Sequence, residues 1–130
     1  MRMMVNLSVT RQRILQTLRY VGMSEDLTGF EYTVAAIDYV IHTDSWPIQY
    51  SSEKGIYGKV AAEFGTSWRN VERSLRYSIQ NVYNQPDLSR LLTVIGYSCH
   101  PDKGVPQVST FLRSLANHVK LEVMSIDTEA

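Results

Sequence analysis

The sequence predicts an all-α domain, and three observations support that class. Apolar residues recur at intervals of three and four along most of the chain, which is the period of an amphipathic helix. No segment keeps the alternation of a strand, and there is no Asn-Gly or Asp-Gly hairpin turn. Capping residues and glycines divide the periodic stretches into short segments. We therefore expect a six-helix bundle with short connections.

The six predicted helices each have an apolar face and a start or stop signal. Ser8 or Thr10 can cap the first, and Gly22 ends it. Thr28 can cap the second, with Glu31 at the spacing of a capping box. The third is opened by Ser51 or Ser52, and the fifth follows Asp87 as cap. We expect helices of about Thr10–Val21, Thr28–His42, Glu53–Phe64, Trp68–Tyr83, Leu88–Ile95 and Gln107–Val123, followed by a frayed tail.

Size and composition limit the class of protein. The 130 residues suit one domain, and a hydrophobic content of 44% is enough for a core. The chain has 13 basic and 13 acidic residues, so any contact with nucleic acid must come from a local basic face. A single cysteine excludes an internal disulfide, and no apolar run approaches the ~18 residues that cross a bilayer. Since the chain also lacks a secretory leader, we expect a cytoplasmic protein without a membrane partner.

The third and fourth segments have the pattern of a helix-turn-helix. Ala61 in the third segment is small enough to let another helix cross closely. Gly65 stands where a helix ends in the left-handed conformation, and Thr66 or Ser67 can cap the next helix. A helix, a short turn with glycine and a longer helix are typical of proteins that place the second helix in the major groove of DNA. The pattern predicts a recognition helix of about residues 67–83.

The predicted recognition helix divides into an apolar and a polar face. Successive apolar residues are four, four and three positions apart, and successive polar residues are four, three and four apart. The apolar set is Val71, Leu75, Ile79 and Val82, and the polar set is Arg69, Arg73, Arg76 and Gln80. A recognition helix needs this division, because its first residues reach base edges while later arginines hold phosphates.

The residue types on the polar face suit DNA. Arginine can hold guanine through two hydrogen bonds, asparagine can do so with adenine, and glutamate can accept from cytosine. The predicted base-reading residues are Asn70, Glu72 and Arg73. The predicted phosphate-binding residues are Ser67, Arg69, Arg76, Tyr77 and, on the preceding helix, Lys59. The same spacing is also typical of a solvated face with weak ion pairs, so spacing alone leaves both interpretations open.

Other kinds of chemistry have little support in the sequence. Cys99, His100 and Asp102 are close together, but their spacing fits no zinc site, which needs two well-placed pairs of ligands. There is no glycine-rich phosphate loop and no serine nucleophile elbow. We expect no enzyme activity, no metal site and no cofactor.

Residues 65–83, GTSWRNVERSLRYSIQNVY, resemble the recognition-helix region of the C-terminal DNA-binding (effector) domain of the sporulation-initiation response regulator family. The most specific piece is Val71-Glu72-Arg73, followed by Leu75-Arg76 and Ile79. Residues 21–37 and 111–122 are similar to the first two helices and the last helix of that domain, and residues 95–97 to the segment before its final loop. The resemblance spans roughly residues 10–123.

The resemblance implies a six-helix bundle of the winged-helix-like effector type, which binds a short DNA box and regulates transcription. In the family an arginine, a glutamate and a second arginine read bases, and Glu72 and Arg73 match the last two. Arg76 matches a phosphate-holding arginine, and Tyr77 matches its neighbour, which is often histidine. The family often binds tandem boxes, so the implied partners are double-stranded DNA, a second copy of the chain and RNA polymerase.

Two departures from the family have consequences. Its first base-reading arginine is replaced by Asn70, and Arg69 lies one residue earlier, turned by ~100° on the helix, so it cannot substitute. If Asn70 reaches a base, adenine is favoured where the family prefers guanine, and since the changed contact costs roughly 1–3 kcal/mol, we expect weaker binding to the family's box. The family's regulator also carries a receiver domain, for which residues 1–130 have no room. If the chain is complete, its activity depends on its concentration or on a partner.

Two hypotheses for the function follow. The leading one is a sequence-specific DNA-binding regulator, a single domain of residues 1–130 with an ordered core of about residues 8–123. The alternative is a protein-interaction module of the same fold that modulates a regulator without specific DNA binding. The neutral net charge and the missing first arginine favour the alternative, whereas Glu72, Arg73 and Arg76 favour DNA.

Overall fold

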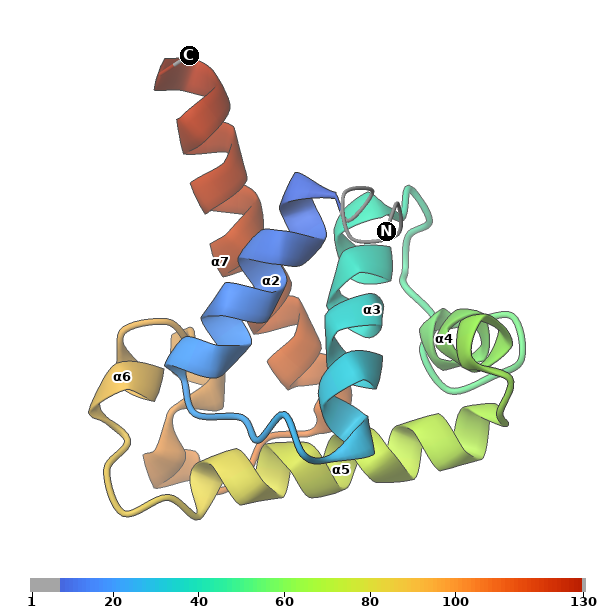
Figure 1. The fold of residues 1–130 in the computed structure, drawn as a ribbon, viewed down its shortest axis with the longest axis horizontal. Helices are drawn as coiled ribbons and strands as arrows, with labels where there is room; N and C mark the ends of the chain where they lie inside the picture. The colour runs from blue at the N-terminus through green and yellow to red at the C-terminus, as the bar shows by residue number, and fades with distance from the viewer. Residues whose placement is uncertain (1–7, 130) are drawn as a thin grey trace.

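Figure 1 shows the bundle in the computed structural model, which describes the backbone of residues 8–129 and the side chains of residues 8–125. These residues form six α-helices and two short 3-10 helices, without a strand. The elements are α2 (Val9–Tyr20), α3 (Thr28–His42), α4 (Ile56–Phe64), α5 (Trp68–Tyr83), α6 (Ser89–Leu92), η1 (Tyr97–Cys99), η2 (Pro101–Lys103) and α7 (Val108–Glu129). The predicted all-α class is confirmed, and α3 and α5 have the predicted bounds.

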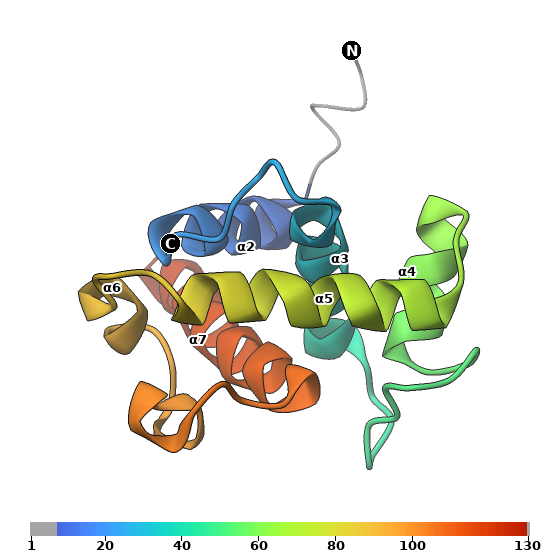
Figure 2. The ribbon, with the colours of Figure 1, turned by 90° about the horizontal axis from the view of Figure 1, so that it is seen from below.

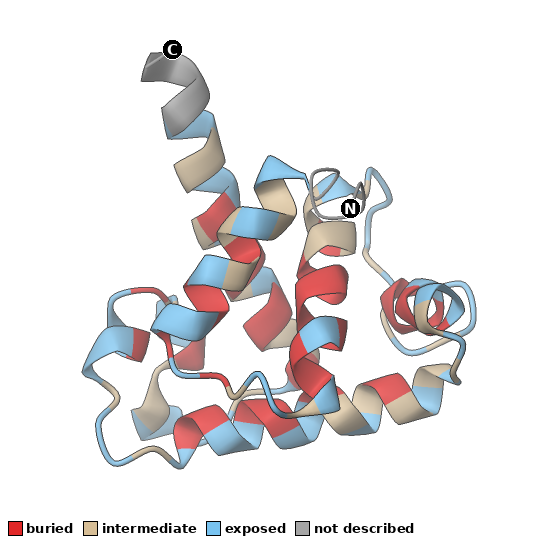
Figure 3. Cartoon of the chain, in the orientation of Figure 1, coloured by how far each residue is buried: buried red, intermediate tan, exposed pale blue. Residues whose placement is uncertain are grey.

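The helix α3 is the centre of the bundle. It packs against α2, α4, α5 and α7, and nine of its 15 residues are buried. Because this helix is apolar on most of its circumference, it has to be covered on several sides at once. Figure 3 shows this as a nearly continuous buried colour along α3, whereas buried and exposed segments alternate along α5. The remaining helices are therefore arranged around α3.

The first turn of α3 approaches α5 so closely that only glycine fits there. A Cβ atom at Gly29 would meet the Ser78 hydroxyl and lie 2.5 Å from the carbonyl oxygen of Ser74. Such a distance is far inside van der Waals contact, and the backbone of α5 cannot move aside as a flexible side chain would. Gly29 therefore sets the distance at which α5 crosses the amino-terminal end of α3, along the lower edge of the bundle in Figure 1.

An ion-pair network ties α4 to the rest of the bundle. The Arg11 guanidinium donates through Nε to Asp38 at 2.8 Å, and through Nη1 and Nη2 to both carboxylate oxygens of Glu63 at 2.8 and 3.0 Å. The Tyr39 hydroxyl donates to Glu63 at 2.8 Å. The hydrogen bonds from Arg11, and then that from Tyr39, lower the pKa of Glu63. Arg11 of α2 thus binds both α3 and α4. Its bidentate contact with Glu63 fixes the orientation of α4 as well as its distance.

The start of α4 differs from the prediction. The helix begins at Ile56 rather than Glu53, and neither predicted serine caps it, since Gly55 is the N-cap and makes no side-chain hydrogen bond. The loop before the helix folds back instead. The N–H groups of Ile56 and Tyr57 donate to the carbonyl oxygens of Gln49 and Tyr50 at 2.9 and 3.0 Å. Backbone carbonyls therefore supply the acceptors that a capping side chain would provide.

Three other helix ends also differ. The predicted capping box at α3 does not form, because Thr28 is already helical and Leu27 is the N-cap without a side-chain hydrogen bond. The helix α6 has only four residues, since Leu88 rather than the predicted Asp87 is its N-cap, and the N–H groups of Thr93 and Val94 bond three residues back at 3.1 and 3.0 Å. The last helix continues past the predicted end to Glu129, since no glycine or proline follows Pro106.

Replacing Gly29 by alanine tests the close approach of α3 to α5. Although alanine is the better helix former, its methyl group has no space beside the backbone of Ser74. We expect G29A to lower the free energy of unfolding by about 1–3 kcal/mol in urea denaturation followed by circular dichroism. The matched control is G96A, whose Cβ would lie 3.4 Å from the Ser114 hydroxyl, an ordinary contact. Equal stability of the two variants would contradict the packing argument.

Replacing Glu63 by glutamine tests the ion pair through its pH dependence. Because the pKa of Glu63 is lowered on folding, its contribution to stability is complete above the ordinary value of 4.5 and is lost as the pH falls through the folded value. We expect the stability advantage of the wild-type protein over E63Q to shrink from about pH 5 towards pH 3 in urea unfolding. The control is E25Q, which removes the same charge from an exposed pair with Arg19. An identical pH dependence in both variants would count against the network.

Candidate nucleic-acid interface

The helices α4 and α5 form the predicted helix-turn-helix. Gly65 has φ 68° and ψ 41°, the left-handed conformation that favours glycine, and it ends α4. The next N–H, that of Thr66, donates to the carbonyl of Ala61 at 3.0 Å. The Ser67 hydroxyl accepts from the N–H of Asn70 at 3.2 Å and caps α5. The glycine turn and the serine cap are both confirmed.

The two predicted faces of α5 are also confirmed. The apolar side chains are at most 1% exposed: Val71, Leu75, Ile79 and Val82. The outer face presents exposed side chains: Arg69, Arg73, Arg76, Tyr77 and Gln80. Figure 2 views this side, where α5 runs across the front of the other helices. The helix carries three arginines and one glutamate, so a locally positive surface exists on a chain with a net charge of zero.

At the amino end of α5, three side chains form one hydrogen-bonded row. The Asn70 amide nitrogen donates to the Thr66 hydroxyl at 3.0 Å, and Arg73 Nη2 donates to Asn70 Oδ1 at 2.9 Å. Two of the predicted base-reading residues, Asn70 and Arg73, are therefore in contact with each other. The part played by Thr66 was not predicted, because Thr66 lies in the turn before the Ser67 cap, where helical spacing does not indicate which side chains meet.

The third predicted base-reading residue, Glu72, belongs to a second group. Its carboxylate lies 3.4 Å from Arg76 Nη2 and accepts from the Ser51 hydroxyl at the same distance. Both contacts are long for hydrogen bonds and therefore weak. The Glu72 side chain is 27% exposed and that of Arg76 54% exposed, so solvent reaches both groups. Glu72 and Arg76 thus compensate each other's charge loosely, and either can be drawn to another partner.

The other predicted phosphate-binding residues are placed unevenly. The Arg69 guanidinium lies 5.1 Å from the centre of the Trp68 ring at the start of α5. Tyr77 is 58% exposed on the outer face. Lys59 lies apart from these residues, because it lines a hollow with Trp46 and Lys54 to which no residue of α5 contributes. Every predicted site residue except Lys59 therefore lies on α5 or, in the case of Ser67, at its N-cap.

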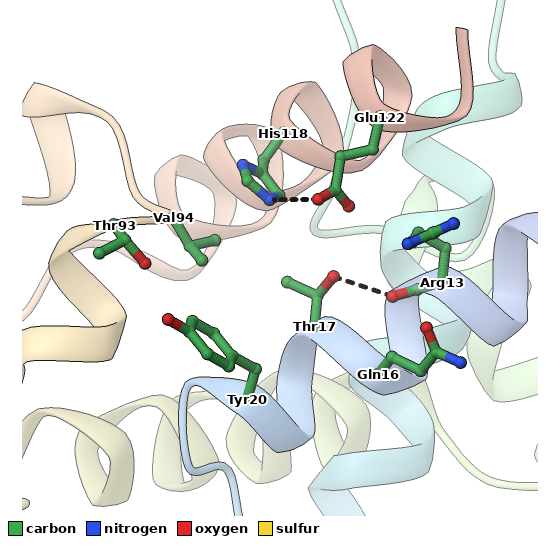
Figure 4. A pocket seen from close by; sticks show the side chains of 8 residues that line it. All are labelled: Arg13, Gln16, Thr17, Tyr20, Thr93, Val94, His118 and Glu122. Atoms are coloured by element: carbon green, nitrogen blue, oxygen red, sulfur yellow. Dashed lines mark hydrogen bonds and ion pairs between the residues drawn. The ribbon is translucent and has the colours of Figure 1, made fainter. Parts of the chain in front are cut away.

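A hollow between α2 and α7 offers a weaker candidate site. It encloses about 410 Å³ and is lined by residues of α2, the turn after α6 and α7 (Figure 4). Two polar contacts lie in its lining: Thr17 Oγ1 donates to the carbonyl of Arg13 at 2.8 Å, and His118 lies 3.3 Å from Glu122, whose Oε1 is buried without a hydrogen-bond partner among the described residues. Neither of these two contacts pairs a nucleophile with a general base, so they do not indicate an active site.

The cysteine–histidine segment is structural in the described chain. The Cys99 thiol is buried and contacts the carbonyl of Thr110 at 3.6 Å. His100 Nδ1 accepts from the N–H of Asp102 at 3.1 Å, which holds the turn of η2. Among the described residues, no three histidine, cysteine or acidic side chains group as metal ligands would. These side chains are explained by packing and by turn formation.

A family model described as sporulation initiation factor Spo0A C terminal matches residues 14–119. The chain belongs to this family. Domains of the Spo0A C-terminal family are DNA-binding effector domains and not an enzyme family. The match includes the whole helix-turn-helix and most of the core, so the predicted family and the general class of DNA-binding regulator are confirmed. None of the described helices has the length and apolar character that a membrane span requires.

Replacing Ser67 by alanine tests the cap that begins α5. The variant leaves the N–H of Asn70 without its acceptor at the helix start. We expect S67A to lower the free energy of unfolding by about 1 kcal/mol, measured by urea denaturation. S67D is the matched control, because aspartate caps as well as serine does. A wild-type stability for S67A, or the same loss in S67D, would show that the cap does not stabilise the helix.

Proposed function

We propose that this protein is a sequence-specific DNA-binding transcription regulator that inserts α5 into the major groove. The observation that carries the proposal is the outer face of α5, where Arg69, Arg73 and Arg76 are exposed and project from a helix whose opposite face is fully buried. A helix held in this way can enter a groove without rearrangement of the core. Membership of a DNA-binding family supports the same proposal.

Base reading is assigned to Asn70, Glu72 and Arg73, with Arg73 as the principal contact. Only one nitrogen of its guanidinium is engaged, by Asn70, so donors remain for the two acceptors of guanine. Glu72 can accept from cytosine once Arg76 turns away from it. That change costs little, because an exposed pair of this kind contributes only about 0.2–1 kcal/mol, and a DNA phosphate offers Arg76 a stronger partner.

Phosphate binding is assigned to Ser67, Arg69, Arg76, Tyr77 and Lys59. The amino end of α5 adds its partial positive charge to the same side. Four of these residues lie on α5 or at its cap, so the proposal has them contact one continuous stretch of the DNA backbone. Lys59 would require the DNA to extend past the amino end of α5 towards α4, which makes it the contact that a short duplex should lose first.

The wider biology of the proposal follows from the family. We propose a cytoplasmic regulator whose copies bind tandem boxes as a dimer and contact RNA polymerase. The competing proposal is a protein-interaction module that modulates a regulator without specific DNA binding. The net charge of zero favours that alternative, because it weakens the non-specific attraction to DNA on which most such proteins rely.

The decisive experiment is an unbiased DNA selection followed by binding measurements on the selected duplex. We expect R73A to lose roughly 1–3 kcal/mol of binding free energy on that duplex and to relax the preference at one base pair. R76A should weaken binding to all duplexes alike and reduce the slope of log K against log salt by about one. K120A is the charge-matched control, since Lys120 is exposed on α7 and not on α5.

The outcomes separate the two proposals. Specific binding that is lost in R73A and retained in K120A supports base reading by α5. Absence of binding to any duplex at low salt would remove the DNA proposal and leave the protein-interaction module. Equal losses in R76A and K120A would show that binding depends on overall charge and not on the α5 face.

A further inference from the structure

We infer that Asn70 is a positioning residue that holds Arg73 in place for base contact, with Thr66 as its anchor. The inference rests on the proposed function, because it concerns how α5 reads DNA. It assigns a specificity-determining role to Thr66, a residue of the turn, and it changes the role of Asn70 from independent base contact to support.

Both polar atoms of the Asn70 amide have hydrogen-bond partners within the protein. Its nitrogen donates to the Thr66 hydroxyl at 3.0 Å, and its oxygen accepts from Arg73 Nη2 at 2.9 Å. The direction of the amide follows from the chemistry of its neighbours. A guanidinium carries only donors, so the amide oxygen must face Arg73, and the nitrogen is then left to face a hydroxyl, which can accept. The hydrogen bonds can therefore run in only one direction, from Arg73 to Asn70 and from Asn70 to Thr66.

This arrangement conflicts with direct reading of adenine by Asn70. Such reading needs the amide oxygen and nitrogen together, directed at the same base edge. Both bonds, to Thr66 and to Arg73, would have to break first. The Asn70–Thr66 bond is also partly buried, so solvent competes with it less than with an exposed contact. Retaining the row and letting Arg73 contact the base requires no such loss.

The hydrogen bond to Asn70 restricts the conformations of the Arg73 side chain before DNA binds. An exposed arginine loses much rotamer freedom when it binds, and a side chain already held in position loses less. Asn70 also leaves Nε, Nη1 and one hydrogen of Nη2 available, which is enough for a two-bond contact with guanine. The structure thus concentrates specificity at the base pair facing Arg73, and we expect little base preference at the pair facing Asn70.

The test compares T66V with T66S. Valine matches the shape of threonine and removes the hydroxyl that accepts from Asn70, whereas serine retains the hydroxyl. We expect T66V to reduce the preference for guanine at the Arg73 base pair by about tenfold, the size of one base-pair discrimination, and T66S to leave it near the wild-type value. Preference is the ratio of dissociation constants for the selected duplex and for a duplex changed at that pair.

A second variant keeps the test independent of any effect of valine on the turn. N70A should reduce the same guanine preference by about tenfold, and adding N70A to R73A should cause no further loss of that preference. At the base pair facing Asn70, N70A should change nothing. A structural role alone would weaken binding to all duplexes equally and leave these ratios unmoved.

Two results would overturn the inference, and they differ from a failure of the proposed function. If N70A abolishes a preference for adenine at the base pair facing Asn70 and leaves the guanine preference at the base pair facing Arg73 intact, Asn70 reads DNA directly. If T66V and N70A both keep the wild-type preferences, the row does not act in recognition. If the wild-type protein binds no duplex with sequence preference, the proposed function itself falls, and the inference with it.

Discussion

The close crossing of α3 and α5 is the constraint on which the rest of the structure depends. Gly29 lets the first turn of the central helix lie against the backbone of α5 at Ser74. A helix held at that distance must bury one stripe completely, and Val71, Leu75 and Ile79 provide it. The opposite stripe is then exposed by necessity. The outward direction of the arginines is thus a consequence of core packing.

The turn between α4 and α5 acquires its geometry from both sides. On one side Gly65 and Ser67 fix the path of the backbone within a few residues. On the other side Arg11 holds α4 through Glu63, from a position 52 residues away in sequence. A helix-turn-helix needs both kinds of restraint, because the local turn determines how the helices are joined while the distant contact determines how the first helix lies against the bundle.

The sequence predicted those features that depend on local chemistry. The faces of α5, the left-handed Gly65 and the Ser67 cap follow from spacing and residue type, and all are confirmed. The start of α4 could not be predicted in this way, since its first N–H groups bond to loop carbonyls whose course depends on tertiary folding. The contact between Asn70 and Arg73 lay within reach of helical spacing, but spacing alone does not say whether an asparagine faces a base or its neighbour.

The neutral charge of the chain and its arginine-rich helix are consistent with each other once the pairing on α5 is considered. Arg76 is compensated by Glu72, whereas Arg69 and Arg73 keep their charge, so the free helix presents less positive charge than its three arginines alone would give. Such a surface attracts DNA of arbitrary sequence weakly, because non-specific binding scales with the phosphates neutralised. In the proposed complex, Arg76 exchanges Glu72 for a phosphate and Glu72 turns to a base. Under that proposal, weak attraction to other sequences raises the ratio of specific to non-specific binding, the quantity that determines occupancy among many competing sites.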